Sequence, residues 1–341
     1  MAGTELGIDM GTANTRIFMD KKIVLNEPTA SAYDLEAEAP IAFGEAAAKM
    51  VGRTPERIQT ISPVTRGVVS DLEMAEQMLR FFLRKICGQK MFKPSIVATI
   101  PAGVTAVEHR SYEDVLKSAG ARKICFVESS IAAAIGMGVD FSRPHGTIIV
   151  DIGEGVTDVA VLSMGGLAER ACVKVASGDF DEAIIRHAHR KHRIAIGKKT
   201  AESIKLQIGT VAPQRLEVSI KAKGRNLYTG LPEVFEITSA QVQEAISEPL
   251  NEIVKGIQSV MERTPPELMA DIYTDGVLLA GNGVRLKGLD GYLSERLGVR
   301  TAFATDINGC VVKGAGKVLK DINLLANTEY KTRALRDLAV E

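Results

Sequence analysis

The chain has 341 residues, of which 45% are hydrophobic and 25% charged, a globular composition with room for two domains. Lysine plus arginine equals aspartate plus glutamate at 42 each, so the net charge is zero. Without a basic excess we expect no nucleic-acid partner, and a net charge near zero does little to keep copies of the chain apart.

Cysteine spacing and hydropathy bear on where the protein works. No CxxC pair is present, and no stretch approaches the ~18 uninterrupted apolar residues of a membrane-spanning helix. The N-terminus runs directly into an apolar strand pattern, without a signal peptide. We therefore expect a cytoplasmic protein with reduced thiols whose membrane contact, if any, is peripheral.

A pattern near the N-terminus recurs in mid-chain. Residues 6–18 and 148–161 each show an apolar strand, then Asp-x-Gly-x-x-x-Thr, then a second apolar strand. The aspartate, glycine and threonine recur at one constant offset of 142 residues, so that Asp9 corresponds to Asp151. Two such matches in the same strand-turn-strand context predict a duplicated domain.

Strands and helices alternate between and after the two copies. The patterns predict strands at residues 95–101, 123–127, 215–222 and 276–280, and helices at 107–119, 130–137, 181–194, 200–208 and 239–263. Ser239 is the expected cap of the long helix. This alternation indicates an α/β fold with mixed or parallel sheets covered by helices.

The two repeated turns have the composition of phosphate-binding hairpins. Glycine lets backbone N–H groups approach a phosphate closely, and two facing turns could clamp a triphosphate. Asp9 and Asp151, one at each strand end, would hold Mg²⁺ through its waters. The alternative is a pair of glycine-rich hairpins with capping aspartates, which the duplication makes the weaker interpretation.

Two further segments are candidates for nucleoside contact. The glycine-rich turn at residues 281–284 could lie against a purine or ribose, or could be a plain strand-to-helix turn. Glu202 and Lys205 share one helix face, where they could bracket a ribose or form a surface ion pair. In the loop at residues 89–94, Met91 and Phe92 stand between lysines. They have the pattern of a shallow membrane anchor, or they fold back into the core.

Together these segments resemble the actin, sugar-kinase and heat-shock chaperone ATPase superfamily. Within it, the chain resembles the MreB family of bacterial cell-shape actins over almost its whole length. The resemblance is carried by residues 7–15, 23–28, 51–55, 67–71, 151–158, 180–185, 200–205, 224–227 and 265–268.

The resemblance implies an actin-like fold of two lobes, built from duplicated mixed-sheet domains around an ATP cleft. Lobe I would span residues 1–147, with a smaller subdomain at about 30–66. Lobe II would span residues 148–330, with a smaller subdomain at about 181–244. Residues 331–341 would form a C-terminal tail.

The resemblance also implies a set of nucleotide contacts. Those to phosphate would come from Thr12, Ala13 and Asn14 in the first turn and from Gly153, Glu154, Gly155 and Val156 in the second. Those to the nucleoside and α-phosphate would come from Glu202, Ser203, Ile204 and Lys205 and from Gly281, Asn282, Gly283 and Val284. Asp9 and Asp151 would serve Mg²⁺, and the family's membrane loop falls on Met91 and Phe92.

By the same resemblance the protein is an ATP-binding cytoskeletal protein that forms filaments with itself on the inner membrane surface. Those filaments would govern cell shape and position wall synthesis, together with cell-elongation membrane proteins. The alternatives are a hydrolysis-poor paralogue that acts as co-polymer or regulator, and a small-molecule kinase of the same superfamily.

Departures from the family pattern concern hydrolysis. Ser129 stands where the superfamily keeps a water-orienting glutamate or glutamine, and a serine hydroxyl is a poor general base. Glu154 adds a carboxylate to the second phosphate turn, and Gly178 stands where the family has aspartate. Glu154 and Thr157 are the remaining catalytic candidates. We expect a weak ATPase at most.

Overall fold

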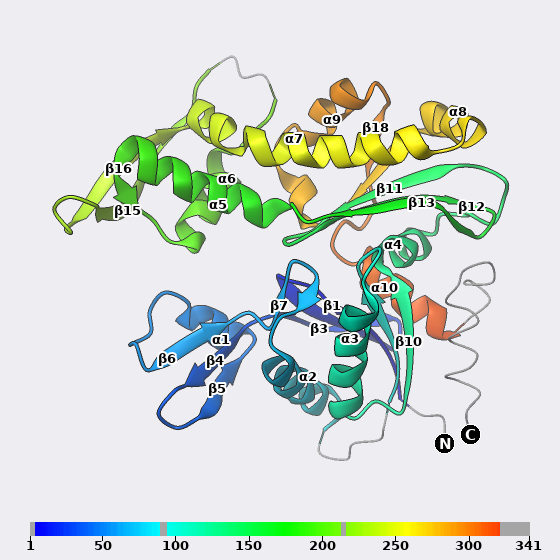
Figure 1. The fold of residues 1–341 in the computed structure, drawn as a ribbon, viewed down its shortest axis with the longest axis horizontal. Helices are drawn as coiled ribbons and strands as arrows, with labels where there is room; N and C mark the ends of the chain where they lie inside the picture. The colour runs from blue at the N-terminus through cyan, green and yellow to red at the C-terminus, as the bar shows by residue number, and fades with distance from the viewer. Residues whose placement is uncertain (1–3, 89–93, 213–215, 321–341) are drawn as a thin grey trace.

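The computed structural model describes residues 4–88, 94–212 and 216–320 of the chain. Figure 1 shows two lobes, each built on a five-stranded sheet with helices packed against it. A smaller three-stranded sheet lies beside each large sheet, at the left of this view in both lobes. The N-terminal lobe is the lower one in the figure, and the lobe that follows it in sequence is the upper one.

The elements alternate along the chain as an α/β fold requires. The strands are β1 (Glu5–Met10), β2 (Asn14–Met19), β3 (Lys22–Pro28), β4 (Ser31–Asp34), β5 (Ala39–Phe43), β6 (Ile58–Ile61), β7 (Val64–Thr65), β8 (Val68–Val69), β9 (Ser95–Ile100), β10 (Lys123–Glu128), β11 (Thr147–Ile152), β12 (Thr157–Ser163), β13 (Gly166–Val173), β14 (Ile194–Ala195), β15 (Ser219–Asn226), β16 (Pro232–Thr238), β17 (Val277–Ala280) and β18 (Thr301–Phe303). The helices are α1 (Glu45–Met50), α2 (Leu72–Cys87), α3 (Ala106–Ser118), α4 (Ser129–Met137), α5 (Ser177–His187), the π-helical turn η1 (Ala188–His192), α6 (Lys198–Ile208), α7 (Ser239–Arg263), α8 (Pro266–Asp275), the 3₁₀ turn η2 (Asn282–Arg285), α9 (Leu289–Leu297) and α10 (Cys310–Lys320).

The two large sheets have the same topology. Their strand orders, β3-β2-β1-β9-β10 and β13-β12-β11-β17-β18, match strand for strand. In each, three antiparallel strands lead into two parallel ones. The repeated turns also match, because Gly11 N–H donates to the Asn14 carbonyl at 3.1 Å and Gly153 N–H to the Val156 carbonyl at 2.9 Å. The predicted duplication of a mixed-sheet domain is confirmed.

Each smaller sheet is inserted into its lobe. The sheet β5-β4-β6 packs with α1 in the first lobe. The sheet β14-β15-β16 lies beside α5 and α6 in the second. The second insertion differs in detail from the sequence prediction. The expected helix at 181–194 begins earlier and ends in the π-helical turn. The expected strand at 215–222 is β15, four residues further along.

The last described helix belongs with the first lobe. Although residues 148–330 were expected to form lobe II, α10 packs against α4, β1 and β9. Glycines make this contact close. A Cβ at Gly136 would lie 1.8 Å from the carbonyl oxygen of Cys310, and a Cβ at Gly314 would lie 1.8 Å from that of Ala132. The expected boundary is therefore wrong by this helix, whose apolar face completes the lower core.

The longest helix has the predicted bounds but a different cap. The side chain of Thr238, rather than Ser239, accepts a hydrogen bond from Gln241 N–H, and the Gln241 side chain accepts one from Thr238 N–H. This reciprocal pair is a capping box. Among the described residues, no helix is long and apolar enough to cross a membrane.

Candidate functional site

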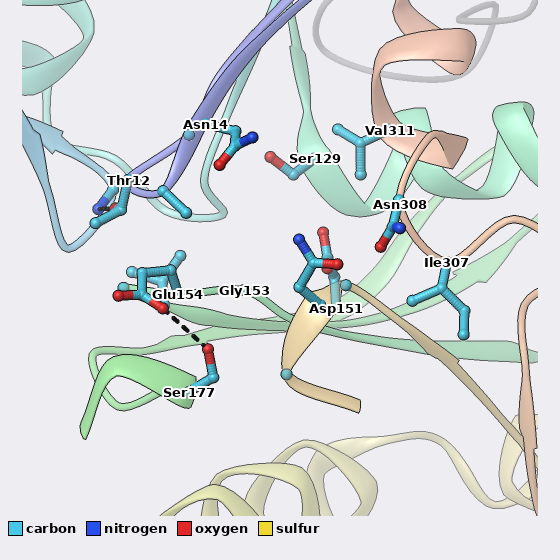
Figure 2. Close-up of a pocket in the computed structure, with 18 of the residues that line it drawn as sticks. Thr12, Asn14, Ser129, Asp151, Gly153, Glu154, Ser177, Ile307, Asn308 and Val311 are labelled. Carbon is cyan, nitrogen blue, oxygen red and sulfur yellow. Dashed lines mark hydrogen bonds between the residues drawn. The ribbon is translucent and has the colours of Figure 1, made fainter. Parts of the chain in front are cut away.

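A cleft of about 360 Å³ lies between the lobes, with residues of both on its walls (Figure 2). Most residues predicted to contact nucleotide or metal line it. They are Asp9, Thr12, Ala13, Asn14, Asp151, Gly153, Glu154, Gly155, Val156, Glu202, Lys205, Gly281, Asn282 and Gly283. Duplication explains the arrangement, because the same strand-turn-strand unit presents its turn to the cleft from each lobe.

Some predicted contact residues have other surroundings. Ile204 and Val284 are each 1% exposed and belong to the core of the second lobe. Ser203 is exposed, and its hydroxyl accepts a hydrogen bond from the Gln207 side chain at 2.8 Å. Thr157 is fully buried and donates to the carbonyl of Val175 at 2.8 Å. These side chains lie outside the cleft lining.

The two repeated glycine turns meet across the cleft where only a glycine fits. A Cβ at Gly155 would lie 2.5 Å from Oγ1 of Thr12 and 2.8 Å from Cα of Arg66. The Thr12 hydroxyl also accepts a hydrogen bond from Gly67 N–H at 3.2 Å. Backbone and hydroxyl groups of both lobes are thereby brought together, as an anion bound between them requires.

The carboxylates at the two strand ends have different surroundings. Asp9 accepts hydrogen bonds from Thr99 Oγ1 at 3.0 Å and from Arg16 at 3.3 Å. Burial, reinforced by the negative charges of Asp158 and Asp9, raises the pKa of Asp151 to about 7. A cation placed among these carboxylates would offset their repulsion and favour the ionised form of Asp151.

A glycine turn and the side-chain oxygen of Asn308 line the cleft together with Asp151. Gly281 has φ +85°, and a Cβ there would lie 2.3 Å from Oδ1 of Asp151, so this turn needs glycine. The Oδ1 atom of Asn308 lines the same cleft, is buried, and has no hydrogen-bond partner among the described residues. Carboxylate and amide oxygens are the ligands that a hydrated Mg²⁺ takes, so the residues fit that ion.

Asp158 joins the lobes behind the metal candidates. It is 2% exposed, and its Oδ1 accepts a hydrogen bond at 3.1 Å from the backbone N–H of Ala102 in the opposite lobe. Burial raises its pKa to about 6, although the Ala102 hydrogen bond acts in the other direction. In the strand pairing Asp158 faces Asp151, as Arg16 faces Asp9 in the first copy.

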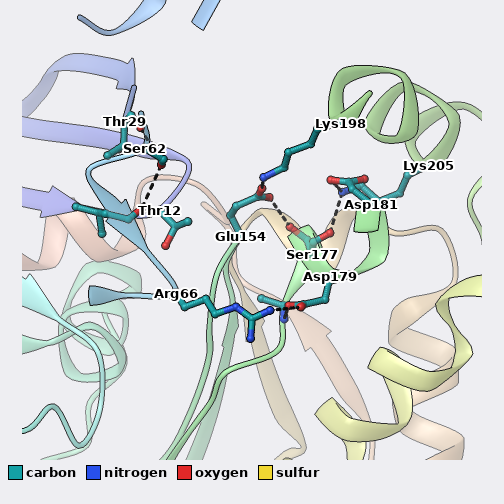
Figure 3. Close-up of polar contacts among 12 residues, drawn as sticks. Thr12, Thr29, Ser62, Arg66, Glu154, Ser177, Asp179, Asp181, Lys198 and Lys205 are labelled. Atoms are coloured by element: carbon teal, nitrogen blue, oxygen red, sulfur yellow. Dashed lines mark hydrogen bonds and ion pairs between the residues drawn. The ribbon is translucent and has the colours of Figure 1, made fainter. Parts of the chain in front are cut away.

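A polar cluster surrounds the second of the two repeated glycine turns, at Glu154 (Figure 3). The Glu154 carboxylate pairs with Lys198 Nζ at 2.7 Å and accepts a hydrogen bond from Ser177 Oγ at 3.1 Å. Burial raises the pKa of Glu154, but the charge and hydrogen bond of Lys198 outweigh it, so the pKa lies below its usual value. Glu154 is therefore ionised, and its carboxylate is held by Lys198 and Ser177.

Lys205 is held deeper in the same cluster. Its Nζ pairs with Asp181 Oδ2 at 2.9 Å and donates to the carbonyl of Ser177 at 3.1 Å. The surface ion pair with Glu202 that the sequence suggested is not formed. Burial raises the pKa of Asp181 to about 6 despite the lowering effect of Lys205.

The MreB/Mbl protein family model matches residues 3–327. The chain belongs to the MreB/Mbl family. It is 39% identical to the cell shape-determining protein Mbl of Bacillus cereus over 338 residues, 98% of this chain and 100% of that one. It is also 39% identical to the cell shape-determining protein MreB of Escherichia coli over 331 residues, 95% of each chain.

A solved structure confirms the actin-like fold. The crystal structure of MreB 5 of Spiroplasma citri bound to AMPPNP superposes with a TM-score of 0.88 at 32% identity. The match covers 95% of this chain and 98% of that one. The two-lobe α/β architecture predicted from the family resemblance is thereby confirmed.

Ser129, expected from the sequence to stand at the water-orienting position of the superfamily, belongs to the wall of the cleft. Its Oγ donates to the carbonyl of Ile100 at 3.1 Å. Its neighbour Glu128 is 1% exposed and is ion-paired with Arg170. Glu128 is thus directed away from the cleft that Ser129 faces, and Figure 2 shows Ser129 apart from Glu154.

Several site residues were not identified from the MreB/Mbl sequence pattern. Ser177, Asn308 and Lys287 line the cleft, and Lys198 pairs with a residue that does. Each lies in a loop or at a helix end. Ser177 lies next to Gly178 in a segment that departs from the family pattern, and the other three have no motif of their own. Met91 and Phe92, the predicted membrane residues, lie outside the described residues, as does the expected C-terminal tail.

Proposed function

We propose that this chain binds ATP with Mg²⁺ in the interlobe cleft and assembles with itself into filaments that govern cell shape. The observation that carries the proposal is the pair of equivalent glycine turns that meet at Thr12 and Gly155. Membership of the MreB/Mbl family supports it, as do relatives named as cell shape-determining proteins. The AMPPNP in the Spiroplasma citri relative supports the choice of ligand.

In this proposal each part of the cleft binds one part of the ligand. Backbone N–H groups of residues 12–14 and 154–156 hold the phosphates, and Gly153, whose N–H donates to the Val156 carbonyl, closes the second turn around them. Asp9 and Asp151 hold Mg²⁺, whose charge would neutralise phosphate oxygens. The bare turn at Gly281–Asn282–Gly283 admits the base and α-phosphate. Glu202 and Lys205 lie beside the nucleoside.

We further propose that hydrolysis is weak. General-base catalysis needs a proton acceptor within hydrogen-bond reach of the attacking water. Ser129 is a poor acceptor, and the Glu154 carboxylate, which accepts a hydrogen bond from Ser177, lies apart from Ser129 (Figure 2). Slow turnover would leave the nucleoside triphosphate in place for longer.

The filaments are proposed to lie on the cytoplasmic side of the inner membrane surface. Cell-elongation membrane proteins would be their partners, and the filaments would position wall synthesis. Met91 and Phe92, flanked by lysines in the sequence, are the proposed contact. Burying two such side chains is worth ~2–4 kcal/mol, which a filament multiplies by avidity. Changing both to serine should reduce co-sedimentation with anionic liposomes. Equal pelleting of variant and wild type would refute this loop as the anchor.

The experiment that tests the central proposal combines nucleotide binding with assembly. Asp151→Ala should weaken Mg²⁺-dependent ATP binding at least tenfold in calorimetry, or about 1.4 kcal/mol. Wild type should pellet with ATP and lipid and show filaments by electron microscopy. Asp290→Ala, a substitution at a helix terminus outside the cleft lining, is the matched control. Wild type that neither binds ATP nor leaves the monomeric state across a wide concentration range would overturn the proposal.

A further inference from the structure

The second phosphate turn contains a carboxylate where an anion is to bind. Glu154 stands at the tip of that turn, between Gly153 and Gly155, and its side chain is 18% exposed. A phosphate group approaching this turn meets a negative charge, which would weaken binding unless a cation compensates it. The only ion pair that a described residue makes with Glu154 is the one with Lys198, at 2.7 Å.

The position of Glu154 is fixed by its neighbours. Its backbone carbonyl accepts a hydrogen bond from Gly178 N–H at 2.9 Å, and its side chain accepts one from Ser177 Oγ. A Cβ at Gly178 would lie 2.8 Å from that carbonyl oxygen and 3.1 Å from Glu154 Oε1. The Glu154 carboxylate thus lies against the first turn of α5. It fills the space that a side chain at position 178 would need.

The two lysines of the cluster differ in freedom. Lys205 is 10% exposed and bound to Asp181, whose side chain is 1% exposed, so moving it would leave a buried carboxylate unpaired. Lys198 is 53% exposed, and Glu154 is its single ion-pair partner among the described residues. A solvated ammonium group on four rotatable bonds can change partners at little cost.

We propose that Lys198 binds the terminal phosphate of a nucleoside triphosphate, and that Glu154 holds it over the second phosphate turn until that phosphate arrives. The inference rests on the proposed function and adds a means of distinguishing triphosphate from diphosphate. With the nucleoside beside Glu202 and Lys205 and the phosphates between the two turns, the last phosphate is the one that meets the Glu154 tip. The triphosphate then takes Lys198 from Glu154, and a diphosphate leaves the pair intact.

The proposed exchange of partners at Lys198 also takes place close to a contact between the lobes. Lys198 is the first residue of α6, and the next residue, Lys199, donates a hydrogen bond to the carbonyl of Ala48 in the opposite small subdomain. A change in the partner of Lys198 therefore takes place one residue away from a contact between the lobes. Figure 3 shows Lys198 above Glu154, with Arg66 and Asp179, a second bridge between the lobes, on the other side of the turn.

The test compares the affinities for Mg·ATP and Mg·ADP by calorimetry or with a fluorescent nucleotide analogue. Lys198→Met keeps an unbranched side chain but removes the ammonium group that pairs with Glu154. It should lower the preference for ATP over ADP about tenfold. Glu154→Gln keeps the shape of the turn and releases Lys198, so it should raise that preference several-fold. The double variant should lie between the two single variants.

Lys191→Met is the matched control, because Lys191 makes a surface ion pair with Glu244 at 3.8 Å in the same subdomain. Its ATP to ADP ratio should equal that of wild type. Wild type that binds both nucleotides, with the same ratio in Lys198→Met and Glu154→Gln, would overturn the inference alone. Wild type that binds neither would overturn the proposed function instead. Urea midpoints establish folding, and if Lys198→Met is unfolded the Glu154→Gln ratio decides.

Discussion

At the scale of a single residue, Ser129 is the residue on which the proposed weakness of hydrolysis rests. Its hydroxyl faces the space between the phosphate turns but is already bonded to the Ile100 carbonyl. Glu128 is paired with Arg170, and the Glu154 carboxylate accepts a hydrogen bond from Ser177. Glu154 also lies apart from Ser129 in Figure 2, so we do not expect it to replace a general base at that position.

Ser129→Glu should therefore accelerate hydrolysis. General-base groups contribute roughly 10²–10⁴ in rate, so we expect at least a tenfold rise in phosphate release. Single-turnover measurements at saturating ATP separate this step from binding and assembly. Ser129→Ala is the control and should leave the rate unchanged. If wild type already hydrolyses quickly and Ser129→Glu changes nothing, the role assigned to this position is mistaken.

The sequence predicted those cleft residues that belong to a motif. Asp9, Asp151 and both glycine turns follow from a spacing that repeats. Asn308 and Ser177 could not be predicted in this way, because their place in the cleft depends on how distant segments pack. The partner of Lys205 was missed for the same reason. Local spacing offered Glu202, whereas the fold brings α5 and its Asp181 closer.

At the scale of the element, helices α4 and α10 pack through glycine. Gly136 and Gly314 each face a carbonyl of the other helix at a distance that no side chain tolerates. This contact joins residues far apart in the sequence, so no local pattern predicts it. It also explains why the boundary of the second lobe was misplaced by a helix.

Gly136→Ala should destabilise the protein by about 1–3 kcal/mol or more, because the new methyl group has to push the two helices apart. The free energy of unfolding in urea is the measurement. Gly291→Ala is the control, since a Cβ there meets nothing within 4 Å in α9. It should be neutral or stabilise by up to about 1 kcal/mol. Equal effects of the two substitutions would contradict the close packing.

Strand boundaries illustrate the limit of pattern reading. The alternation at residues 215–222 predicted a strand, but β15 spans Ser219–Asn226, where β16 provides its partner. Leu216 and Val218, which contributed to the pattern, are 82% and 48% exposed. Apolar alternation marks a segment able to form a strand, and pairing with a neighbour decides where it begins and ends. By contrast, the helix α7 carries its own cap and amphipathic face, and its bounds were predicted.

At the scale of the whole molecule, the lobes are joined across a cleft that concentrates negative charge. Ala102 N–H to Asp158 and the ion pair Arg66–Asp179 hold the lobes together. Asp151 and Asp158 lie in one lobe, and Asp9 comes from the other. Burial and mutual repulsion raise the pKa of Asp151 to about 7, and burial raises that of Asp158 to about 6.

The stability of the nucleotide-free protein should consequently fall as pH rises. Both carboxyls have folded-state pKa values above their ordinary value, so the folded state binds more protons than the unfolded state in the window from about pH 4 to about 7. The free energy of unfolding decreases through that window and levels off above it. Between pH 5.5 and 8 we expect a loss on the order of 1–2 kcal/mol from these groups.

Asp151→Asn isolates this contribution from that of the histidines. Hydrogen bonding to Asp275 raises the pKa of His145, so its contribution also falls with rising pH, whereas burial lowers the pKa of His187 and acts in the opposite sense. Neither histidine is changed in the Asn variant. The variant should therefore exceed wild type in stability by more at pH 8 than at pH 5.5, and Mg·ATP should flatten the wild-type profile by supplying a cation to the ionised carboxylates. Urea unfolding at both pH values gives the comparison. Parallel profiles for wild type and Asp151→Asn would show that the pKa of Asp151 is not raised in the folded protein.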